Sequence, residues 1–355
     1  MNTLPVSDLP NTQPPWIENT PSANPMIVSS RIRLARNIRH LRFPHKLFGD
    51  HKSIIFLQVK ETLEDMPEFP GPSLVSMGDT SDIGRRILFE RHLISAEMAC
   101  MGKGSGVFVD QSGLTAVMVN EEDHLRIHTL HSGLDLDTLW ARVSTLERAI
   151  AEHIPFAYND DLGYLTACPT NVGTGMRASV MLHLAGLEMC DELDAVMRGA
   201  QELGLTTRGA FGEGSEPEGG FVQISNQSTL GEDESTILRR LKAAVNRLTD
   251  AEAGIRGQLI HDKTTALRDA VGRALGILRY AHSISTEEAF QHLGTLRLGA
   301  HCELLPSIEA GQLDKLLVAI QPGHLRATTR NADAGQTARD NLRASLIRKR
   351  LFQEP

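Results

Sequence analysis

The chain has 355 residues, of which 41% are hydrophobic, and carries a formal net charge of -8. This acidic balance excludes a broadly basic surface that coats nucleic acid, and no apolar run reaches the roughly 18 residues needed to cross a membrane. The four cysteines show no Cys-x-x-Cys spacing, which fits a reducing cytoplasm and argues against a structural zinc site. The composition therefore indicates a cytoplasmic globular protein with one large domain or two ordinary ones.

The first 25 residues differ in composition from the rest of the chain. Five prolines stand among polar residues at positions 1–21, and the segment lacks the charged and apolar regions of a secretory signal. A segment of this kind buries too little apolar surface to offset its loss of chain entropy. We therefore expect residues 1–25 to form a disordered tail.

The remaining chain reads as short strands followed by helices. Leu125 and Ile127 alternate with Arg126 and His128, which predicts a strand, and a helix is predicted to begin after Asp135 and to extend to about residue 150. Beyond residue 230 the strand patterns disappear, and apolar residues recur at helical spacing. The other predicted strands cover 107–109, 114–120, 177–184, 205–211 and 221–225, and the later helices cover 238–248, a stretch from 285, 313–320 and 337–352.

These elements place a domain boundary near residue 255. We expect a sheet-rich domain over residues 26–255 and an α-helical domain over residues 256–355. The glycine-rich stretch at 102–106 is interpreted as a hairpin turn rather than a phosphate-binding loop.

Four arginines fall within nine positions of this acidic chain, at 31, 33, 36 and 39. Arg31 and Arg33 are two residues apart, so on a strand both side chains point to one face. Arg36 and Arg39 are three apart, which suits the first turns of a helix, and we expect both to be solvated. Arg31 and Arg33 therefore have the stronger claim to a function.

Three further arginines lie in strand-like segments beside turns, namely Arg126, Arg177 and Arg208. Together with Arg31 and Arg33 they suit a clamp for a polyanion such as a nucleoside triphosphate, because guanidinium groups hold phosphate oxygens in a bidentate manner. The sequence contains no G-x-x-x-x-G-K-[ST] loop and no H-R-D or D-F-G motif, which excludes a P-loop enzyme and a protein kinase of the usual fold.

The segments SSRIRLARN, NEEDHLRI, CPTNVGTGMRAS, RGAFGEG and ISNQSTLGEDE follow one another in the order seen in the guanidino (phosphagen) kinases. The chain resembles this family over roughly residues 26–250. The resemblance implies an α+β fold, with an antiparallel sheet flanked by helices, followed here by an α-helical C-terminal domain. It also implies an ATP site formed by Ser29, Ser30, Arg31, Ile32, Arg33, His92, Arg126, Arg177, Ala178, Ser179, Val180, Met181, Arg208, Gly209, Ala210, Phe211 and Gly212.

Acidic residues near these motifs suit transfer of a phosphoryl group to a guanidinium. A guanidinium has a pKa near ~13, so its deprotonation at neutral pH costs about 8 kcal/mol, and a positioned carboxylate has to take the proton. The resemblance makes Glu122 the base, Glu213 the residue that orients the guanidinium, and Cys168 the family's reactive cysteine beside the substrate. Glu121 and Asp123, next to the base, are expected to be solvent-facing turn residues.

The segment 212–220 contains four glycines and three glutamates between two predicted strands. Such a loop suits closure over a bound substrate, although a floppy hairpin connection is the alternative. Mg²⁺ is expected with ATP. The sequence shows no dedicated carboxylate cage, so the phosphates and water are expected to hold the ion.

Departures from the small-molecule enzymes indicate a branch of the family. Only 28 residues precede Ser29, where the resemblance leads us to expect a helical N-terminal domain that encloses a small substrate. This difference and the helical C-terminal region resemble the bacterial protein-arginine kinases. The sequence ARDNLRAS resembles that branch's phosphoarginine-binding element, which implies an allosteric site at Arg339, Asp340 and Arg343. An exposed basic helix is the alternative.

The resemblance therefore implies an ATP-dependent protein-arginine kinase that marks proteins for regulation or for degradation by a Clp protease. The alternatives are a kinase for free arginine and a catalytically silent phosphoarginine-binding adaptor. The implied partners are a heat-shock repressor, misfolded proteins and an activating zinc-finger protein, and the implied assembly is a homodimer. The sequence does not indicate which proteins or arginines are modified.

Overall fold

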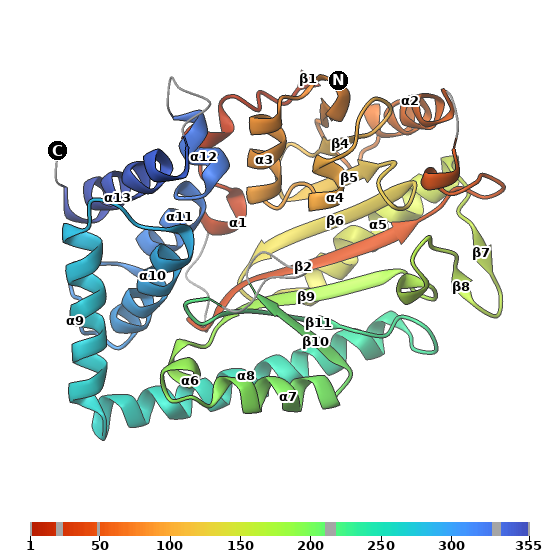
Figure 1. Cartoon of the computed structure of the whole chain (residues 1–355). Helices are drawn as coiled ribbons and strands as arrows, with labels where there is room; N and C mark the ends of the chain where they lie inside the picture. Colours follow the sequence, from red (N-terminus) through yellow and green to blue (C-terminus); the bar gives the residue numbers. More distant parts are fainter. Residues whose placement is uncertain (1, 19–23, 48–49, 210–217, 329–334, 354–355) are drawn as a thin grey trace. The chain divides into compact units, whose positions relative to one another are not determined.

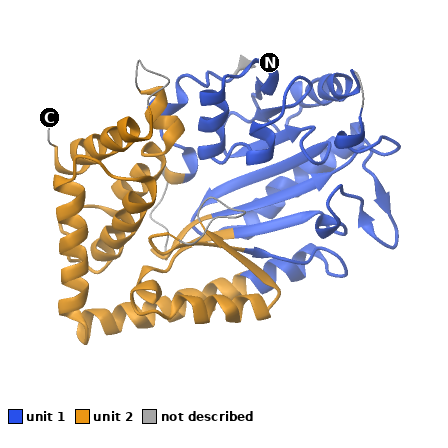
Figure 2. Ribbon diagram, viewed as in Figure 1, with its two compact units in different colours: residues 1–16, 30–179, 225–241 blue, residues 17–29, 180–224, 242–355 orange. Residues whose placement is uncertain are grey.

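The computed structural model describes residues 2–18, 24–47, 50–209, 218–328 and 335–353. Its contacts divide the chain into two compact units, each built from three separate stretches of sequence (Figure 2). Unit 1 comprises residues 1–16, 30–179 and 225–241, and unit 2 comprises residues 17–29, 180–224 and 242–355. The predicted boundary at residue 255 falls inside one long helix, α8 (Glu234–His261), and the last change of unit, between residues 241 and 242, falls inside the same helix.

The strands form one sheet, in the order β1-β3-β4-β5-β6-β2-β9-β11-β10. In unit 1 the pairs β3–β4, β4–β5 and β5–β6 are antiparallel, and β1 pairs with β3 in parallel. The strands are β1 (Asn2–Thr3), β2 (Ile27–Arg36), β3 (Ser73–Ser76), β4 (Gly106–Val109), β5 (Thr115–Val119), β6 (Leu125–Ser132), β9 (Met176–His183), β10 (Leu205–Gly209) and β11 (Phe221–Asn226), with a separate hairpin of β7 (Tyr158–Asn159) and β8 (Gly163–Tyr164).

Helices cover both faces of the sheet in unit 1. Val107 and Val109 of β4 join a buried apolar cluster with residues of α3 and α4, whereas Phe108 lies on the other face, with its ring 5.4 Å from that of Phe56 in α2. This alternation follows from the two-residue period of a strand. The helices are α2 (His51–Glu64), α3 (Asp82–Glu90), α4 (Ala96–Ala99) and α5 (Leu136–His153), with 3₁₀ turns at Leu9–Asn11, Pro44–Lys46, Met77–Asp79 and Pro169–Asn171.

Side-chain caps fix where several of these helices begin. Ser81 accepts a hydrogen bond from the backbone N–H of Gly84, and Ser95 accepts one from Met98. Each cap satisfies a backbone donor that has no partner within the helix. The helices α3 and α4 lie in a stretch for which no helix was predicted from the sequence.

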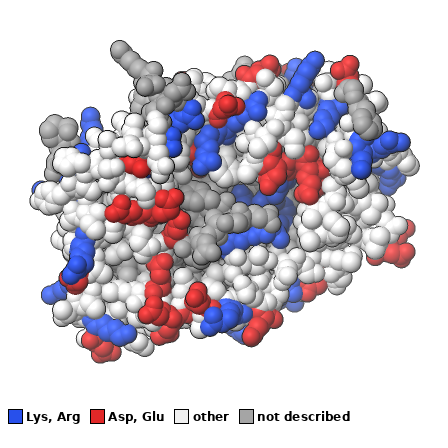
Figure 3. Space-filling view, viewed as in Figure 1, with Lys and Arg blue, Asp and Glu red and all other residues white. Residues whose placement is uncertain are grey.

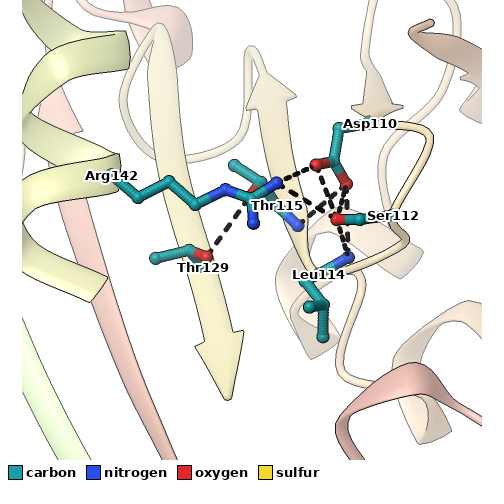
Figure 4. A network of polar contacts seen from close by, with 6 residues as sticks. All are labelled: Asp110, Ser112, Leu114, Thr115, Thr129 and Arg142. Atoms are coloured by element: carbon teal, nitrogen blue, oxygen red, sulfur yellow. Dashed lines mark hydrogen bonds and ion pairs between the residues drawn. The ribbon is translucent and has the colours of Figure 1, made fainter. Parts of the chain in front are cut away.

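A polar network closes the hairpin between β4 and β5 (Figure 4). The carboxylate of Asp110 accepts hydrogen bonds from Ser112 Oγ at 2.7 and 2.9 Å and from the backbone N–H of Thr115 at 3.1 Å. Arg142 of α5 forms an ion pair with the same carboxylate. The 102–106 stretch, by contrast, follows α4 and leads into β4, so it is a turn but not the hairpin turn that was predicted.

Residues 2–16 pack in unit 1, although the sequence predicted a disordered tail over residues 1–25. Trp16 of α1 (Pro15–Glu18) is buried, and its indole N–H donates to the backbone oxygen of Arg91 at 3.4 Å. The guanidinium of Arg91 in turn donates to the backbone oxygens of Leu9 and Thr12. One buried aromatic ring and these backbone contacts hold the segment in place despite its proline-rich composition.

The helical part of unit 2 is a bundle of α9 to α13 (Figure 1). Its helix α10 begins where the capping pattern predicted, because Ser285 accepts a hydrogen bond from the backbone N–H of Glu288 at 3.1 Å. Within the described residues, no helix combines the length and apolarity needed to cross a membrane. The helices are α6 (Ala185–Met189), α7 (Leu193–Glu202), α8 (Glu234–His261), α9 (Thr264–Tyr280), α10 (Thr286–His301), α11 (Ala310–Ala319), α12 (Pro322–Ala327) and α13 (Gln336–Phe352).

A buried polar network joins α8 to the end of β9 in unit 2. Glu252 accepts hydrogen bonds from the backbone N–H groups of Gly186 and Leu187 at 2.8 and 2.9 Å, and so caps α6. The same carboxylate pairs with Arg256 at 2.7 Å, and Arg256 donates to the backbone oxygen of His183 at 3.1 Å. The two buried charges compensate each other, although Nη1 of Arg256 has no hydrogen-bond partner among the described residues.

Candidate functional site

The site begins with the alternation of side chains along β2. Ile32 and Leu34 are fully buried, and Arg31 and Arg33 occupy the intervening positions. The strand continues to Arg36, so the helix that the spacing of Arg36 and Arg39 predicted does not form there. Arg31 and Arg33 therefore share one face of the sheet, as the sequence predicted.

Strand β6 brings a second pair of polar residues to the site. Arg126 lies opposite Met118 of β5, and His128 lies opposite Ala116. Cross-strand partners point to the same face, and Met118 and Ala116 belong to the apolar cluster beneath α3 and α4. Arg126 and His128 therefore point toward the α3–α4 region, where His92 lies.

A tight turn before β9 positions Arg177. Gly175 has φ of 60°, and a Cβ added there would lie 2.7 Å from the backbone oxygen of Ala35 and 2.6 Å from a guanidinium nitrogen of Arg36. Glycine therefore allows the start of β9 to lie directly against the end of β2. Arg177, two residues later, interacts electrostatically with Arg31 and Arg33.

The four arginines Arg31, Arg33, Arg126 and Arg177, here called the arginine cluster, lie close enough to perturb one another. Burial, then Arg126 and Arg177, lowers the pKa of Arg31 to about 10. Burial and the neighbouring arginines lower the pKa of Arg33 well below its ordinary value. The positive charges of the cluster repel one another, and a bound polyanion would relieve this repulsion.

Two buried donors of the arginine cluster have no partner among the residues that the structure describes. These are the Nε–H groups of Arg31 and Arg33. A buried donor without an acceptor costs about 1–3 kcal/mol, and phosphate oxygens are the acceptors that suit a planar guanidinium best. The arrangement therefore suits a phosphate-bearing ligand.

Glu121 contacts the arginine cluster, although it was expected to be a solvent-facing turn residue. It is 3% exposed, and its two carboxylate oxygens lie 2.7 and 2.8 Å from one guanidinium nitrogen of Arg126. Ser95 Oγ also donates to it. Burial alone would raise the pKa of Glu121, but Arg126 and these hydrogen bonds lower it overall. Glu121 therefore fixes the position of Arg126.

Asp123 is also buried, so the expectation that it faces solvent was wrong. Its carboxylate accepts hydrogen bonds from Asn37 Nδ2 at 2.5 Å and from the backbone N–H of Ala167 at 2.7 Å. Asp123 thereby ties the turn before β6 to the chain segment that carries Cys168. The Sγ atom of Cys168 lies 3.0 Å from Thr170 Oγ1.

Glu122, between these two buried carboxylates, is exposed at the surface of the turn. Partial desolvation raises the pKa of Glu122, and the negative charges of Asp123 and Glu121 raise it further. A carboxylate with a raised pKa is a stronger base than an ordinary one, and it is accessible to a substrate here. Glu122, the predicted base, thus combines exposure with a raised pKa.

His92 lies at the end of α3 with φ of 60°, and its ring centroid is 5.1 Å from that of Trp16. Burial, followed by the charges of Arg31 and Arg33, lowers the pKa of His92 to about 3. The imidazole is therefore neutral at physiological pH. A flat, neutral ring beside the arginine cluster suits contact with an uncharged part of a nucleotide.

The remaining predicted ATP-site residues are distributed between the two units. Ser30 is buried, and its Oγ accepts from the backbone N–H of Asp135 at 3.3 Å. Ala178 donates its backbone N–H to Asn226 at 2.8 Å. Ser29, Val180, Met181, Arg208 and Gly209 belong to unit 2, Ser179 ends the second stretch of unit 1, and Ala210, Phe211, Gly212 and Glu213 lie outside the described residues.

The C-terminal arginine motif lies on α13. Arg343 is fully buried and donates to the backbone oxygens of Ile320 and Ile284, at 3.1 and 2.7 Å. It also pairs with Asp340 at 2.6 Å. Arg343 therefore joins α13 to two other parts of the helical bundle, which differs from an exposed basic helix. Arg339 is partly exposed on the same helix.

No cluster of three or more histidine, cysteine, aspartate or glutamate side chains suited to a metal ion occurs in the part of the chain that the structure describes. Acidic and basic side chains are interspersed over the face drawn in Figure 3.

Comparison with known proteins gives two family matches. Residues 55–255 match the ATP:guanido phosphotransferase C-terminal catalytic domain, and residues 264–355 match the protein-arginine kinase McsB C-terminal domain. The protein-arginine kinase of Halothermothrix orenii is 38% identical over 95% of this chain and 96% of the relative. The protein-arginine kinase of Symbiobacterium thermophilum is 39% identical over the same shares. The chain belongs to the protein-arginine kinase family.

Structural similarity agrees with membership of the protein-arginine kinase family at the level of the fold. The duplicated taurocyamine kinase of Schistosoma mansoni matches 72% of this chain and 38% of its own length, with a TM-score of 0.60 and 22% identity. The expected α+β fold with its antiparallel sheet and helical C-terminal region is thereby confirmed.

Sequence reasoning missed three residues near the arginine cluster: Trp16, Glu121 and His128. His128 had a usable signal, because its spacing of two from Arg126 puts both on one face of a strand. The contact of Trp16 with His92 joins segments far apart in the sequence, so no local pattern reveals it.

Proposed function

We propose that this chain transfers the γ-phosphoryl group of ATP to arginine side chains of proteins. Membership of the protein-arginine kinase family supports the reaction class. The observation that carries the proposal is the arginine cluster: its members lie close enough to act on one another electrostatically, and the buried Nε–H groups of Arg31 and Arg33 lack acceptors among the described residues.

In the proposed reaction, the arginine cluster binds and orients the triphosphate, and neutralises charge that develops on the transferred group. Glu122 takes a proton from the substrate guanidinium as its nitrogen attacks the γ-phosphorus. The N–P bond forms, the bond to the β-phosphate oxygen breaks, and ADP leaves. Glu213 and Cys168 stay proposals for orienting the guanidinium, and Arg208 for contacting phosphate. Mg²⁺ held by phosphates and water would neutralise further charge.

The resemblance also supports proposals about regulation. Arg339, Asp340 and Arg343 are proposed to bind phosphoarginine, which would make the product an effector of the enzyme. The proposed partners are a heat-shock repressor, misfolded proteins, an activating zinc-finger protein and a Clp protease that degrades marked proteins. A homodimer in the cytoplasm is the proposed assembly.

To test the proposal, the protein is incubated with ATP, Mg²⁺ and either casein or free L-arginine. The phosphorylated residues are then identified by mass spectrometry under non-acidic conditions. We expect phosphate on casein arginines. Glu122→Gln should lower the turnover about 10²- to 10⁴-fold, because it removes the base, whereas the exposed Glu152→Gln on α5 should leave it unchanged.

Transfer to free L-arginine alone would instead identify a small-molecule kinase. Phosphate on serine or tyrosine alone would refute the proposal. Wild-type protein that binds phosphoarginine but transfers no phosphate to either acceptor would identify a silent adaptor.

A further inference from the structure

His128 is a histidine of β6 whose side chain points toward the arginine cluster. It lies two residues after Arg126, opposite Ala116, so both side chains point to the α3–α4 side of the sheet. The charges of Arg31, Arg33 and Arg126 all act on the ring, and so does His92. His128 therefore lies within the group of residues that would surround a bound polyanion.

The ring of His128 is buried without hydrogen-bond partners. The residue is 2% exposed, and neither Nδ1 nor Nε2 has a partner among the described residues. The neighbouring His124 differs at one nitrogen: its Nδ1 accepts from the backbone N–H of Ile38 at 3.2 Å, whereas its Nε2 also has no partner among the described residues. A buried polar atom without a hydrogen-bond partner is destabilising, so the two nitrogens of His128 need an explanation.

The charge state of His128 limits what this partner can be. Burial and the neighbouring cations hold the pKa of His128 well below its ordinary value, so the ring is neutral and carries one N–H donor and one acceptor nitrogen. The arginines around it offer donors only. The N–H of His128 therefore needs an acceptor that the arginines lack, and His92, although it acts on the ring, forms no hydrogen bond with it. A phosphate oxygen held by the same arginines would supply the acceptor.

We propose that His128 is a further nucleotide-binding residue, whose ring N–H donates to a phosphate oxygen of the nucleotide bound by the arginine cluster. This assignment rests on the proposed function for the identity of the ligand. It adds a neutral donor to a set of cations. Such a donor orients a phosphate oxygen without adding positive charge to an already crowded cluster.

The experiment measures the affinity of the full chain for MgATP and MgADP by calorimetry. His128→Leu replaces the ring by an apolar side chain and so removes the donor. His128→Gln keeps an N–H donor of similar reach. Thr129→Val is the matched control, because Thr129 is the next residue on β6, faces the other side of the sheet and pairs with Thr115 at 3.2 Å. Circular dichroism and thermal melting confirm that each variant is folded.

We expect His128→Leu to weaken the binding of both nucleotides about tenfold to hundredfold, the range for a hydrogen bond to a charged group. His128→Gln should stay close to wild type, as should Thr129→Val. Wild-type affinity in His128→Leu would overturn the proposal. A loss in His128→Gln as large as that in His128→Leu would also overturn it, because a donor would then not be what matters.

A second measurement avoids dependence on the folding of the variants. In protein labelled with ¹⁵N-histidine, the ring resonances of His128, assigned by their loss in His128→Gln, should shift on addition of MgADP. Unchanged His128 resonances at a saturating nucleotide concentration would overturn the proposal. Both measurements report binding without a phosphoryl acceptor, so a chain that binds ATP but phosphorylates no protein would refute the proposed function and leave the role of His128 standing.

Discussion

Buried arginines in unit 1 fall into two kinds. Arg36, which the sequence analysis expected in solvent, is 1% exposed and pairs with Glu147 at 2.9 Å. It also donates to the backbone oxygen of Thr174 at 3.0 Å, and its guanidinium lies 3.4 Å from the ring centroid of Tyr164. Arg36 is therefore satisfied within the fold, whereas Arg31 and Arg33 keep buried Nε–H groups without acceptors among the described residues. Arg36 therefore stabilises the fold, whereas Arg31 and Arg33 suit a bound ligand.

His124 shows how a buried neutral histidine links stability to pH. Its Nδ1 accepts a backbone hydrogen bond from Ile38, and burial lowers its pKa to about 4. In the unfolded chain its pKa is ~6.5, so the unfolded state binds a proton more readily. The contribution of neutral His124 to the free energy of unfolding is therefore complete above pH ~6.5 and is lost as the pH falls toward about 4.

We expect His124→Gln to reduce this acid sensitivity. Glutamine keeps an oxygen acceptor for the N–H of Ile38 but does not titrate. Between pH ~7 and ~5 the wild type should lose about 2 kcal/mol more unfolding free energy than the variant, as measured by urea unfolding at each pH. Equal losses in the two proteins would show that His124 does not carry the effect.

At the scale of elements, close backbone contacts position the end of the 212–220 segment in unit 2. Gly219 donates its N–H to Gln291 of α10 at 2.9 Å. A Cβ added to Gly294 on the same helix would lie 2.0 Å from the backbone oxygen of Gly219. Glycine at both positions therefore lets β11 begin directly against α10. This contact anchors one end of the segment that contains Glu213.

Gly294→Ala should break this contact. The added methyl group has no space, so we expect a loss of about 1–3 kcal/mol in unfolding free energy, measured by chemical denaturation. Gly272→Ala on α9 is the control, because no atom lies within 4 Å of its added Cβ. Replacement of a helical glycine at such a position should stabilise by about 0.5–1 kcal/mol. A stabilising Gly294→Ala would contradict the tight approach.

At the scale of the whole molecule, the two units are interleaved along the chain. Each contains three separate stretches, and β2, β9 and β11 each include residues of both units. In unit 2, His183 at the end of β9 contacts the backbone oxygen of Gly294 in α10 at 3.1 Å. Residues before and after position 255 thus share one core, although the two family matches meet near that position.

A fragment of residues 1–255 should therefore fail to fold as the whole chain does. It would keep residues 180–224 but lose the helices α9 to α13, of which α10 packs against those residues, and it would end inside α8. We expect a broad, low-temperature unfolding transition and rapid proteolysis, compared with the full chain under the same conditions. Mixing with residues 256–355 should restore protection from the protease. A fragment as stable as the full chain would show that the matched families fold independently.

The sequence by itself determined the order and type of most elements after residue 100, because their apolar periodicity and caps are local properties of the chain. It also determined the family, through motifs that keep their order, and the face of β2 that carries Arg31 and Arg33. The elements missed between residues 51 and 99 include short helices, α3 and α4, with only a few turns of periodicity from which to predict them.

Only the tertiary structure decided which polar residues are buried together. The sequence around Arg36, Glu121 and Asp123 is typical of surface residues. In the structure each of them is buried and contacts a partner elsewhere in the chain. The tertiary structure also decided that Trp16 packs beside His92 and that His128 lies beside the arginine cluster. The physical reason is that burial and charge compensation depend on distances across the fold, which the spacing of residues along a chain does not contain.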